Sequence, residues 1–246
     1  MINNKKAVIT GASRGIGFAI AKALLSKGYT VVITGRNKES LQKAAEKLGE
    51  NCLFLVWDMA KPDEIEQKFK EAVNMLGGLD VFVNNAGVFA KCNEWGDDSL
   101  LNMSVEQWES VITVNTTSLL FGMQQAVKYF KENNIKGNVL NVTSVSGFEP
   151  VYGAYGASKC TANALTRGWG KMFAKYGITI NGIAPGPVAT EMNNWHEGDP
   201  MENSRIPYGR FSTADEIASL AIYLLSDEAK MVCGETVILD GGYAIR

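Results

Sequence analysis

Residues 5–17 read KKAVITGASRGIG, a short apolar run followed at once by a loop with three glycines. We interpret the run as a buried strand and residues 15–27 as the helix that follows it. Gly11 permits a tight turn, Gly15 lets a phosphate approach the backbone, and Gly17 allows the helix to pack closely. The start of that helix offers free N–H groups and a positive dipole end to a pyrophosphate. The spacing is GxxxGxG rather than GxGxxG, and a glycine-rich turn without a ligand is the alternative.

Apolar runs followed by amphipathic segments recur along the rest of the chain. Further strands are expected at 30–35, 52–57, 79–85, 138–144, 178–185 and 235–241, and the longest helices at about 104–131, 152–175 and 213–226. The runs are apolar almost throughout, which is typical of strands that helices cover on both faces. The pattern therefore predicts an α/β, doubly wound Rossmann fold with one parallel seven-stranded sheet. No linker or repeat divides the chain, so we expect one domain over 1–246.

Composition narrows the class of function. The 246 residues are 46% hydrophobic and 20% charged, with a net charge of −2 and no basic stripe that would favour nucleic acid. No apolar run approaches the roughly 20 residues that span a bilayer, and the chain shows no secretory signal. Four scattered cysteines indicate free thiols in a reducing compartment, and a single histidine argues against a metal centre. We therefore expect a cytoplasmic protein that binds no nucleic acid, membrane or metal.

The end of the second strand bears on which nucleotide is bound. An acidic residue there would accept the ribose 2′-hydroxyl of NAD, whereas an arginine accommodates the 2′-phosphate of NADP. Here the strand ends in Gly35-Arg36, without an acid. Arg14, inside the glycine loop, supplies a second cation for that phosphate. These residues predict NADP(H) as cofactor; the alternative is that both arginines are solvated surface residues.

Tyr155 and Lys159 stand four residues apart in VYGAYGASKC, a spacing that places both on one face of a helix. A positive charge about 4 Å from a phenol, at an effective dielectric of about 20, is worth roughly 4 kcal/mol. That interaction would lower the pKa of Tyr155 by roughly three units and make it a proton donor near neutral pH. Such a pair also arises by chance, but here it accompanies the glycine loop and Ser144 just upstream.

The order of these motifs resembles the short-chain dehydrogenase/reductase family, and is closest in pattern to the bacterial 3-oxoacyl-[acyl-carrier-protein] reductases. The resemblance covers essentially the whole chain. It rests on the glycine loop, Asp58 after the third strand, Asn84-Asn85-Ala86-Gly87, Asn115, Ser144 with Tyr155 and Lys159, Pro185-Gly186 with Thr190, residues 207–211 and Asp240-Gly241-Gly242. No one of these segments is specific by itself, whereas their order is.

The resemblance implies a role for each residue of a catalytic set. Tyr155 donates a proton to a carbonyl oxygen during reduction, or removes one from an alcohol during oxidation. Ser144 hydrogen-bonds the same oxygen as charge develops on it. Lys159 lowers the pKa of Tyr155 and binds ribose hydroxyls, and Asn115 fixes a water in a proton relay.

The predicted cofactor site combines the glycine loop with positions that the resemblance implies. Its members are Gly11, Ser13, Arg14, Gly15, Ile16, Gly17, Arg36, Asp58, Met59, Asn85, Ala86, Gly87, Tyr155, Lys159, Pro185, Gly186, Val188 and Thr190. Simpler interpretations stay open for three polar residues. Ser144 would cap a turn, with Ser146 as a rival for its role. Asn115 would bond helix backbone, and Asp58 would cap a helix.

Two loops depart from the pattern of the carrier-protein reductases. Segment 91–99, KCNEWGDDS, is an apparent insertion, and Ser144 and Tyr155 are slightly closer in sequence than is usual. In that branch two arginines dock the acyl carrier protein, and the matching positions here are Ile135 and Tyr176. Three lysines lie nearby in the sequence, but the weaker basic footprint reduces the support for a carrier-linked substrate.

Residues 190–207 are expected to form a lid over the substrate. Met192, Trp195 and Met201 would line an apolar pocket, with Trp95 of the inserted loop opposite. The alternative is that these side chains pack the lid onto the domain or contact another subunit. The acidic side chains of the lid disfavour a polyanionic substrate.

Together, the motifs and the resemblance predict an NADPH-dependent oxidoreductase that interconverts a carbonyl and a secondary alcohol. Reduction of a 3-oxoacyl thioester is the first hypothesis, and oxidoreduction of a hydroxysteroid, a sugar or another secondary alcohol is the second. A non-catalytic NADP-binding regulatory protein is the third, with the least support because it has no need of the catalytic set. The family is commonly oligomeric, so we expect a homotetramer or a dimer.

Overall fold

A computed structural model of the protein describes residues 5–89 and 100–244. Seven parallel strands form one sheet in the order β3-β2-β1-β4-β5-β6-β7. Their bounds are β1 Lys6–Ile9, β2 Thr30–Gly35, β3 Cys52–Val56, β4 Val81–Asn84, β5 Asn138–Val142, β6 Thr179–Pro185 and β7 Thr236–Leu239. All seven lie within the expected ranges, and the predicted doubly wound α/β fold is confirmed. The strand order reverses at β1, so a ligand is expected outside the carboxyl ends of β1 and β4.

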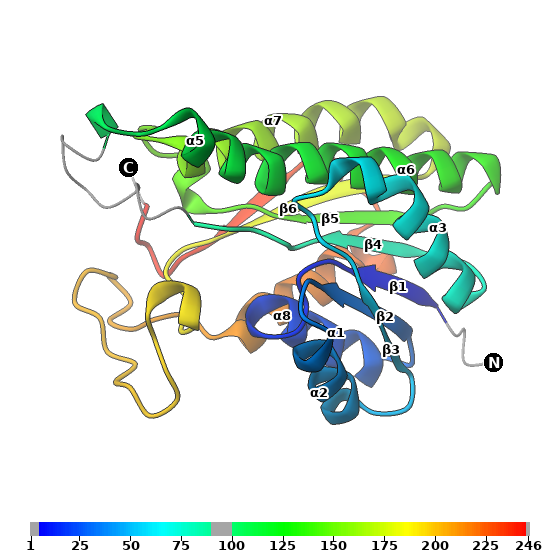
Figure 1. Ribbon diagram of the computed structural model, residues 1–246, viewed down its shortest axis with the longest axis horizontal. Coiled ribbons are helices and arrows are strands. Elements are labelled where there is room, and N and C mark those ends of the chain that lie inside the picture. Colours follow the sequence, from blue (N-terminus) through cyan, green and yellow to red (C-terminus); the bar gives the residue numbers. More distant parts are fainter. Residues whose placement is uncertain (1–4, 90–99, 245–246) are drawn as a thin grey trace.

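Helices cover both faces of this sheet (Figure 1). One layer holds α1 Gly15–Ser26, α2 Lys38–Leu48 and α8 Ala214–Leu224. The other holds α3 Ile65–Leu76, α5 Val105–Ile112, α6 Ser118–Glu132 and α7 Ala154–Phe173. Within the described residues, none of these helices combines the length and apolar character that a membrane span requires.

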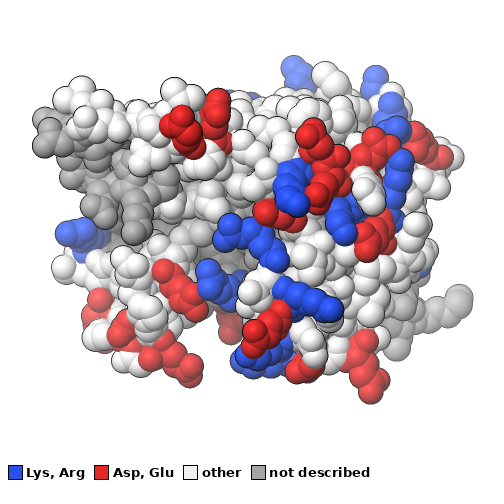
Figure 2. All heavy atoms as spheres, in the orientation of Figure 1, with Lys and Arg blue, Asp and Glu red and all other residues white. Residues whose placement is uncertain are grey.

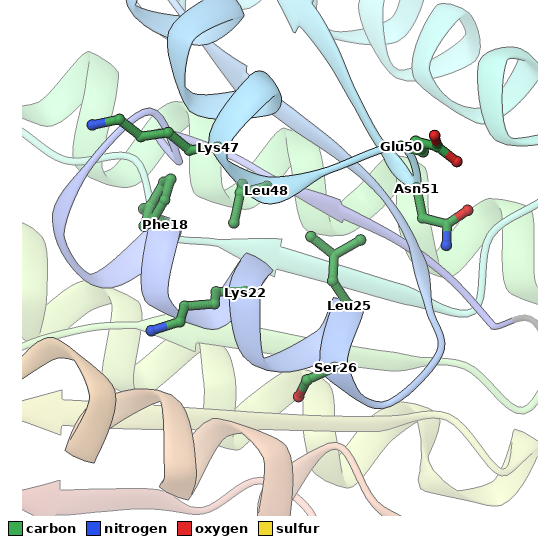
Figure 3. A pocket seen from close by; sticks show the side chains of 8 residues that line it. All are labelled: Phe18, Lys22, Leu25, Ser26, Lys47, Leu48, Glu50 and Asn51. Carbon is green, nitrogen blue, oxygen red and sulfur yellow. The ribbon is translucent and has the colours of Figure 1, made fainter.

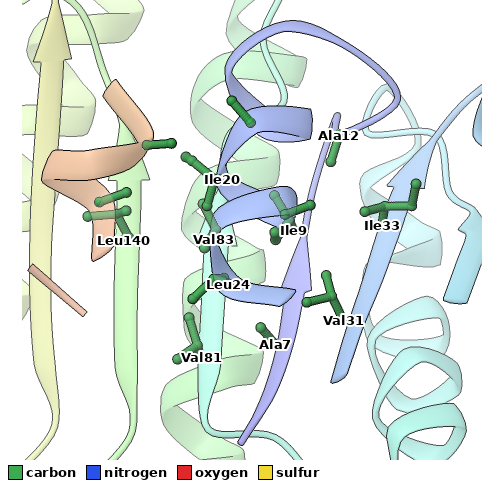
Figure 4. Packing of buried hydrophobic residues seen from close by; sticks show 14 of the residues in the cluster. Ala7, Ile9, Ala12, Ile20, Leu24, Val31, Ile33, Val81, Val83 and Leu140 are labelled. Carbon is green, nitrogen blue, oxygen red and sulfur yellow. The ribbon is translucent and has the colours of Figure 1, made fainter. Parts of the chain in front are cut away.

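Alternate residues of the central strands fill two separate hydrophobic cores. In β1, Ala7 and Ile9 belong to the core beneath α1 and α8, whereas Val8 belongs to the core beneath α3 and α6. Figure 4 shows the first core, in which Ile20 and Leu24 of α1 lie over the strands. Full burial of a side chain of this size contributes roughly 1.5–3 kcal/mol. Because both faces of the central strands are buried, a period of two does not appear as alternating polarity, and these strands are mostly apolar.

The helix expected at 104–131 is interrupted in the structure. A π-helical turn, Thr113–Thr117, lies between α5 and α6. Such a turn inserts one extra residue and rotates the side chains that follow. Asn115 lies in this turn with an exposure of 2%. The interruption was not predicted because one extra residue hardly alters the apolar periodicity on which a helix is recognised.

Candidate active site and cofactor cleft

A cleft of about 1690 Å³ runs along the carboxyl ends of the strands. Every predicted cofactor residue except Gly17 lines it, and so do Ser144, Met192 and Trp195. Asn115 and Met201 do not line it, and Trp95 lies outside the described residues. Figure 2 shows acidic side chains gathered over the lid and basic side chains between the lid and α2.

A second, smaller depression of about 550 Å³ lies between α1 and the end of α2 (Figure 3). Phe18, Leu25 and Leu48 form its apolar part, and Lys22 and Lys47 stand at its sides. No predicted site residue lines it. The chemistry that the sequence predicts therefore belongs to the larger cleft.

The glycine loop between β1 and α1 has a backbone that favours glycine. Gly11 and Gly15 have φ angles of 64° and 59°, in the left-handed region. A Cβ on Gly11 would lie 2.7 Å from the Cα of Ala86, and a Cβ on Gly17 would lie 2.4 Å from Nδ2 of Asn85. Gly17 thus lies against the segment after β4 rather than in the cleft, whereas Gly15 faces the cleft.

Hydrogen bonds fasten the segment 85–87, which follows β4, to the glycine loop. Nδ2 of Asn85 donates to the carbonyl oxygens of Thr10 (2.9 Å) and Gly11 (2.8 Å). The backbone N–H groups of Asn85 and Ala86 both donate to Oγ1 of Thr10, each at 3.0 Å. These bonds hold the ends of β1 and β4 together at the point where the strand order reverses.

Three predicted catalytic residues meet where α7 begins. Ser144 follows β5, and α7 carries Tyr155 and Lys159 in its first two turns. The side chain of Ser144 hydrogen-bonds Tyr155, while Nζ of Lys159 lies 5.5 Å from the Tyr155 ring centroid. That Nζ donates to the carbonyl oxygen of Val142 at 3.2 Å. Oγ of Ser144 also accepts the N–H of Ser146 at 3.1 Å, so Ser144 both caps a turn and faces Tyr155.

The expected lowering of the Tyr155 pKa by Lys159 is wrong in direction. Burial raises the pKa of Tyr155, and the hydrogen bond with Ser144 opposes that shift only in part. Burial also lowers the pKa of Lys159 from 10.5 to about 8. Both shifts share one cause, because the protein interior disfavours the phenolate and the ammonium alike. Lys159, at 5% exposure, is therefore still protonated at neutral pH, but less firmly than a surface lysine.

Asn115 joins three segments of the site through its side-chain amide. Oδ1 accepts the N–H of Val88 (2.8 Å), and Nδ2 donates to the carbonyl oxygen of Val88 (3.0 Å) and to Oγ of Ser158 (3.1 Å). Oγ of Ser158 in turn donates to the carbonyl oxygen of Tyr155 at 2.6 Å. Both Nδ2 hydrogens are engaged by protein, so the amide positions the site and has no donor left for a relay water.

The predicted phosphate cations differ in their surroundings. Arg36 follows β2 and lines the cleft as an exposed side chain. Arg14, at the start of α1, pairs with Glu191 of the lid, with Nη1 and Oε2 2.8 Å apart. Asp58 does not cap a helix; its Oδ1 accepts the N–H of Ala60 at 3.0 Å and shapes the turn that leaves β3.

The lid begins with a short 3₁₀ turn, Glu191–Asn193, and then folds back on itself. Nε1 of Trp195 donates to the carbonyl oxygen of Pro200 at 3.2 Å, which ties the lid internally while Trp195 still lines the cleft. The carbonyl oxygen of Met201 accepts the N–H of Phe211, so this part of the lid pairs with the segment before α8. Met201 was expected in the pocket, but it pairs with this segment and does not line the cleft.

Comparison with known proteins decides the family. A family model described as enoyl-(acyl carrier protein) reductase matches residues 11–244, which include the glycine loop, Ser144, Tyr155 and Lys159. The chain belongs to the short-chain dehydrogenase/reductase family. It is therefore an oxidoreductase of a family that acts on CH–OH groups with a nicotinamide cofactor.

Members of the family with assigned reactions cover nearly the whole chain. The 3-oxoacyl-[acyl-carrier-protein] reductase FabG of Thermotoga maritima is 35% identical, over 99% of this chain and 99% of the relative. Its Vibrio cholerae counterpart is 33% identical, over 98% of each chain. Glucose 1-dehydrogenase 2 of Bacillus subtilis is 34% identical, over 99% of this chain and 96% of the relative. Relatives named for two different classes of substrate thus share similar sequence identity with this chain.

Solved structures of related proteins superpose closely on this one. A short-chain dehydrogenase from Bacillus anthracis has a TM-score of 0.87 at 31% identity and covers 100% of this chain and 99% of its own. A single-residue variant of the actinorhodin polyketide ketoreductase, solved with NADPH, has a TM-score of 0.89 at 27% identity with the same coverage.

Phe89 is a site residue that the sequence analysis missed. Its ring centroid lies 4.6 Å from that of Tyr155, in a tilted contact, and half of its surface remains exposed to the cleft. It comes two residues after Gly87, at the edge of the loop taken as an insertion. An aromatic residue so close to a cofactor-lining segment was the available signal. Phe89 forms an aromatic wall beside the phenol.

Proposed function

We propose that the protein is an NADPH-dependent oxidoreductase that interconverts a carbonyl and a secondary alcohol, with Ser144, Tyr155 and Lys159 as its catalytic residues. One observation carries the proposal. The hydroxyls of Ser144 and Tyr155 are hydrogen-bonded to each other inside the cleft, and the ammonium of Lys159 lies beside the same ring. Two converging hydroxyls beside a buried cation suit a carbonyl oxygen that gains charge and a proton.

The cleft fits a dinucleotide along its length. A glycine loop opens onto the start of α1, Arg36 stands beside it, and the lining continues to Tyr155 and Lys159. Arg14 and Arg36 would bind the 2′-phosphate that distinguishes NADPH from NADH, and the structural neighbour solved with NADPH agrees with that choice. When bound, the nicotinamide supplies or accepts the hydride.

The side chains divide the work of proton transfer. Because burial raises its pKa, Tyr155 keeps its proton at neutral pH and is ready to donate it to a carbonyl oxygen. Ser144 donates a hydrogen bond to that oxygen. Lys159 is protonated below a pH of about 8 and stabilises the phenolate that forms as the proton leaves. Asn115 anchors α7 through Ser158 and so fixes the position of Tyr155.

A 3-oxoacyl thioester is the first candidate substrate. Support comes from the FabG relatives, which match over the full length of the chain. On the lid, the charged residues that line the cleft are acidic, namely Glu191 and Glu197. That charge disfavours a long polyanionic carrier or nucleotide thioester but not the acyl portion itself.

An uncharged ketone or secondary alcohol is the second candidate, favoured by the walls of the cleft. Phe89 lies against Tyr155, and Met192 and Trp195 line the same cleft, so its walls carry aromatic and thioether surface. The glucose dehydrogenase relative shows that the family takes substrates other than thioesters at this level of identity. A non-catalytic NADP-binding protein has the least support, because it would not need the catalytic residues together.

We propose a cytoplasmic homo-oligomer, a tetramer or dimer, built from one domain that spans residues 1–246. Exposed apolar side chains on two helices and on an edge strand offer surface for contacts between subunits. On α5 these are Val105 and Trp108, on α6 Phe121, and on the edge strand β7 Ile238. Sedimentation of the purified protein would measure the assembly directly.

The activity is tested by following oxidation of NADPH, with NADH in parallel, against a panel of carbonyl compounds. The panel holds acetoacetyl-CoA, an acyl-carrier-linked 3-oxoester, ketosteroids, ketoses and simple diketones. NADPH-linked activity on the thioesters supports the first candidate, and activity confined to uncharged ketones supports the second. Tight NADPH binding with no turnover on any member would overturn both in favour of a binding protein.

A further inference from the structure

An ion pair joins the two sides of the cofactor cleft. Arg14 belongs to the glycine loop, and Glu191 is the first residue of the 3₁₀ turn in the lid. Their atoms Nη1 and Oε2 are 2.8 Å apart, and both side chains line the cleft. The side chains are 74% and 57% exposed, so solvent and a ligand reach both of them.

The three cations at this end of the cleft are not equivalent. Arg14 pairs with Glu191 at 2.8 Å, and Lys22 lies 3.9 Å from Asp215 of α8. Within residues 5–89 and 100–244, Arg36 forms no ion pair. A 2′-phosphate would therefore find Arg36 available at once but would have to compete with a carboxylate for Arg14.

In this competition Arg14 binds the 2′-phosphate more strongly than it binds Glu191, but the carboxylate still weakens the binding of the phosphate. An exposed pair between single charges is weak, because water screens it and two long side chains must be held in place. A phosphate carries more charge and offers an arginine two parallel hydrogen bonds.

We propose that Glu191 is a residue that sets cofactor selectivity, by competing with the 2′-phosphate of NADP(H) for Arg14. This inference rests on the proposed use of NADPH. Glu191 reduces the advantage that Arg14 gives to the phosphorylated cofactor. When the phosphate binds Arg14, the first turn of the lid loses its ion pair with the glycine loop. A cofactor without that phosphate leaves the ion pair in place.

The test uses 2′,5′-ADP and 5′-ADP, which share the adenosine and differ in the 2′-phosphate. Neither contains the nicotinamide, so neither reports on catalysis. Dissociation constants are measured by calorimetry for the wild type, Glu191→Gln, Arg14→Gln and the double variant. The neutral Glu191→Gln variant should bind 2′,5′-ADP about three- to tenfold more tightly and 5′-ADP about equally.

Coupling between the two residues separates competition from a general charge effect. In the Arg14→Gln background the gain from Glu191→Gln should disappear, whereas in Arg14→Lys, which keeps the cation, it should persist. Glu197→Gln is the matched control, because Glu197 is a second lid carboxylate that lines the same cleft. It should change the affinity for 2′,5′-ADP by less than about twofold. Circular dichroism checks that each variant folds.

Three results would overturn the inference. Glu191→Gln leaves the affinity for 2′,5′-ADP unchanged, or its gain persists without a cation at position 14, or Glu197→Gln gives the same gain. If any of these appears while the wild type still prefers 2′,5′-ADP over 5′-ADP, the proposed NADPH preference survives alone. If the wild type binds the two ligands equally, both proposals fall.

Hydrogen exchange over residues 190–196 tests the effect on the lid separately. Saturating 2′,5′-ADP should increase exchange of these amides in the wild type, and 5′-ADP should leave it unchanged. In Arg14→Gln neither ligand should alter it. Equal protection by both ligands would contradict the release of the lid.

Discussion

The two ends of the cleft are built in different ways. At the cofactor end, contacts that involve main-chain atoms fix the geometry, because Gly11 lies against Ala86, and Asn85 donates to the carbonyls of Thr10 and Gly11. At the substrate end, an exposed side chain forms the wall, because Phe89 contacts Tyr155 and is 50% exposed. Main-chain geometry requires particular residues at particular spacings, whereas an exposed wall accepts many side chains.

This difference explains why family and reaction type follow from the motifs while substrate does not. Short-chain dehydrogenases of similar identity here include both thioester reductases and a glucose dehydrogenase. The motifs that predict the family lie at the cofactor end and among the catalytic residues. Substitutions that disrupt one end of the cleft and leave the other intact therefore test this comparison.

The largest effect is expected from Gly11→Ala, which breaks the cofactor end. The new Cβ would lie 2.7 Å from the Cα of Ala86, and the residue would keep a φ of 64°. Backbone strain costs about 1–3 kcal/mol, and overpacking adds about 1–3 kcal/mol. Gly77→Ala is the matched control, because Gly77 has the same φ of 64° but its new Cβ would meet only Nζ of Lys6, at 3.6 Å. Denaturant unfolding should show a larger loss for Gly11→Ala; equal losses would contradict the role of the close contact.

Arg36→Asp should alter cofactor choice without altering the fold. Loss of a charge-assisted hydrogen bond, worth about 1.5–3 kcal/mol, weakens NADPH binding by roughly 10- to 100-fold. NADH has no 2′-phosphate, so its affinity should hold or improve. Lys38→Asp serves as the control, since Lys38 is an exposed cation on α2 that does not line the cleft. An unchanged ratio of the two dissociation constants would remove Arg36 from the phosphate site.

The pH dependence of reduction should reveal Lys159. Burial lowers its pKa to about 8, so the residue is charged below that pH and neutral above it. Tyr155 has a raised pKa and keeps its proton over this range. The value of kcat/KM for reduction should therefore fall above a pH of about 8, approaching tenfold per unit. Lys159→Arg keeps its charge and should move the fall to higher pH. A profile that is flat to a pH of about 10 would contradict a required ammonium.

The smallest effect is expected at the substrate end, from Phe89→Ala. Removing the ring that lies 4.6 Å from Tyr155 should raise KM for the best ketone of the panel by about two- to tenfold. The dissociation constant of NADPH should not change, because the glycine loop is untouched. Phe89→Leu keeps apolar surface and should give a smaller change. If NADPH affinity falls together with KM, Phe89 belongs to the cofactor end instead.

Much of the fold follows from local pattern. The seven strands lie within their predicted ranges because each is a mostly apolar run bounded by turn residues. The close packing at Gly17 also follows from spacing, since a glycine there is needed beside Asn85. The π turn at Thr113–Thr117 does not follow, because the insertion of one residue leaves the composition and periodicity almost unchanged.

What the sequence leaves open depends on contacts between distant segments. A Tyr-x-x-x-Lys spacing does not tell how deeply the pair is buried, and burial reverses the expected pKa shift of Tyr155. The pairing of Arg14 with Glu191 joins the first loop to the lid, and no local pattern marks it. Met201 does not line the cleft, and its backbone pairs with Phe211, a pairing that only the folded lid shows.

The most direct test of the account is Tyr155→Phe, measured for turnover and for NADPH binding on the same preparation. The variant keeps the ring that contacts Phe89 and loses the hydroxyl that hydrogen-bonds Ser144. Turnover should fall by about 10²- to 10⁴-fold, the usual contribution of a general acid, while the NADPH dissociation constant stays within about twofold. Tyr223→Phe, at an exposed tyrosine of α8, should behave as the wild type. Near-normal turnover in Tyr155→Phe would contradict the proposed chemistry.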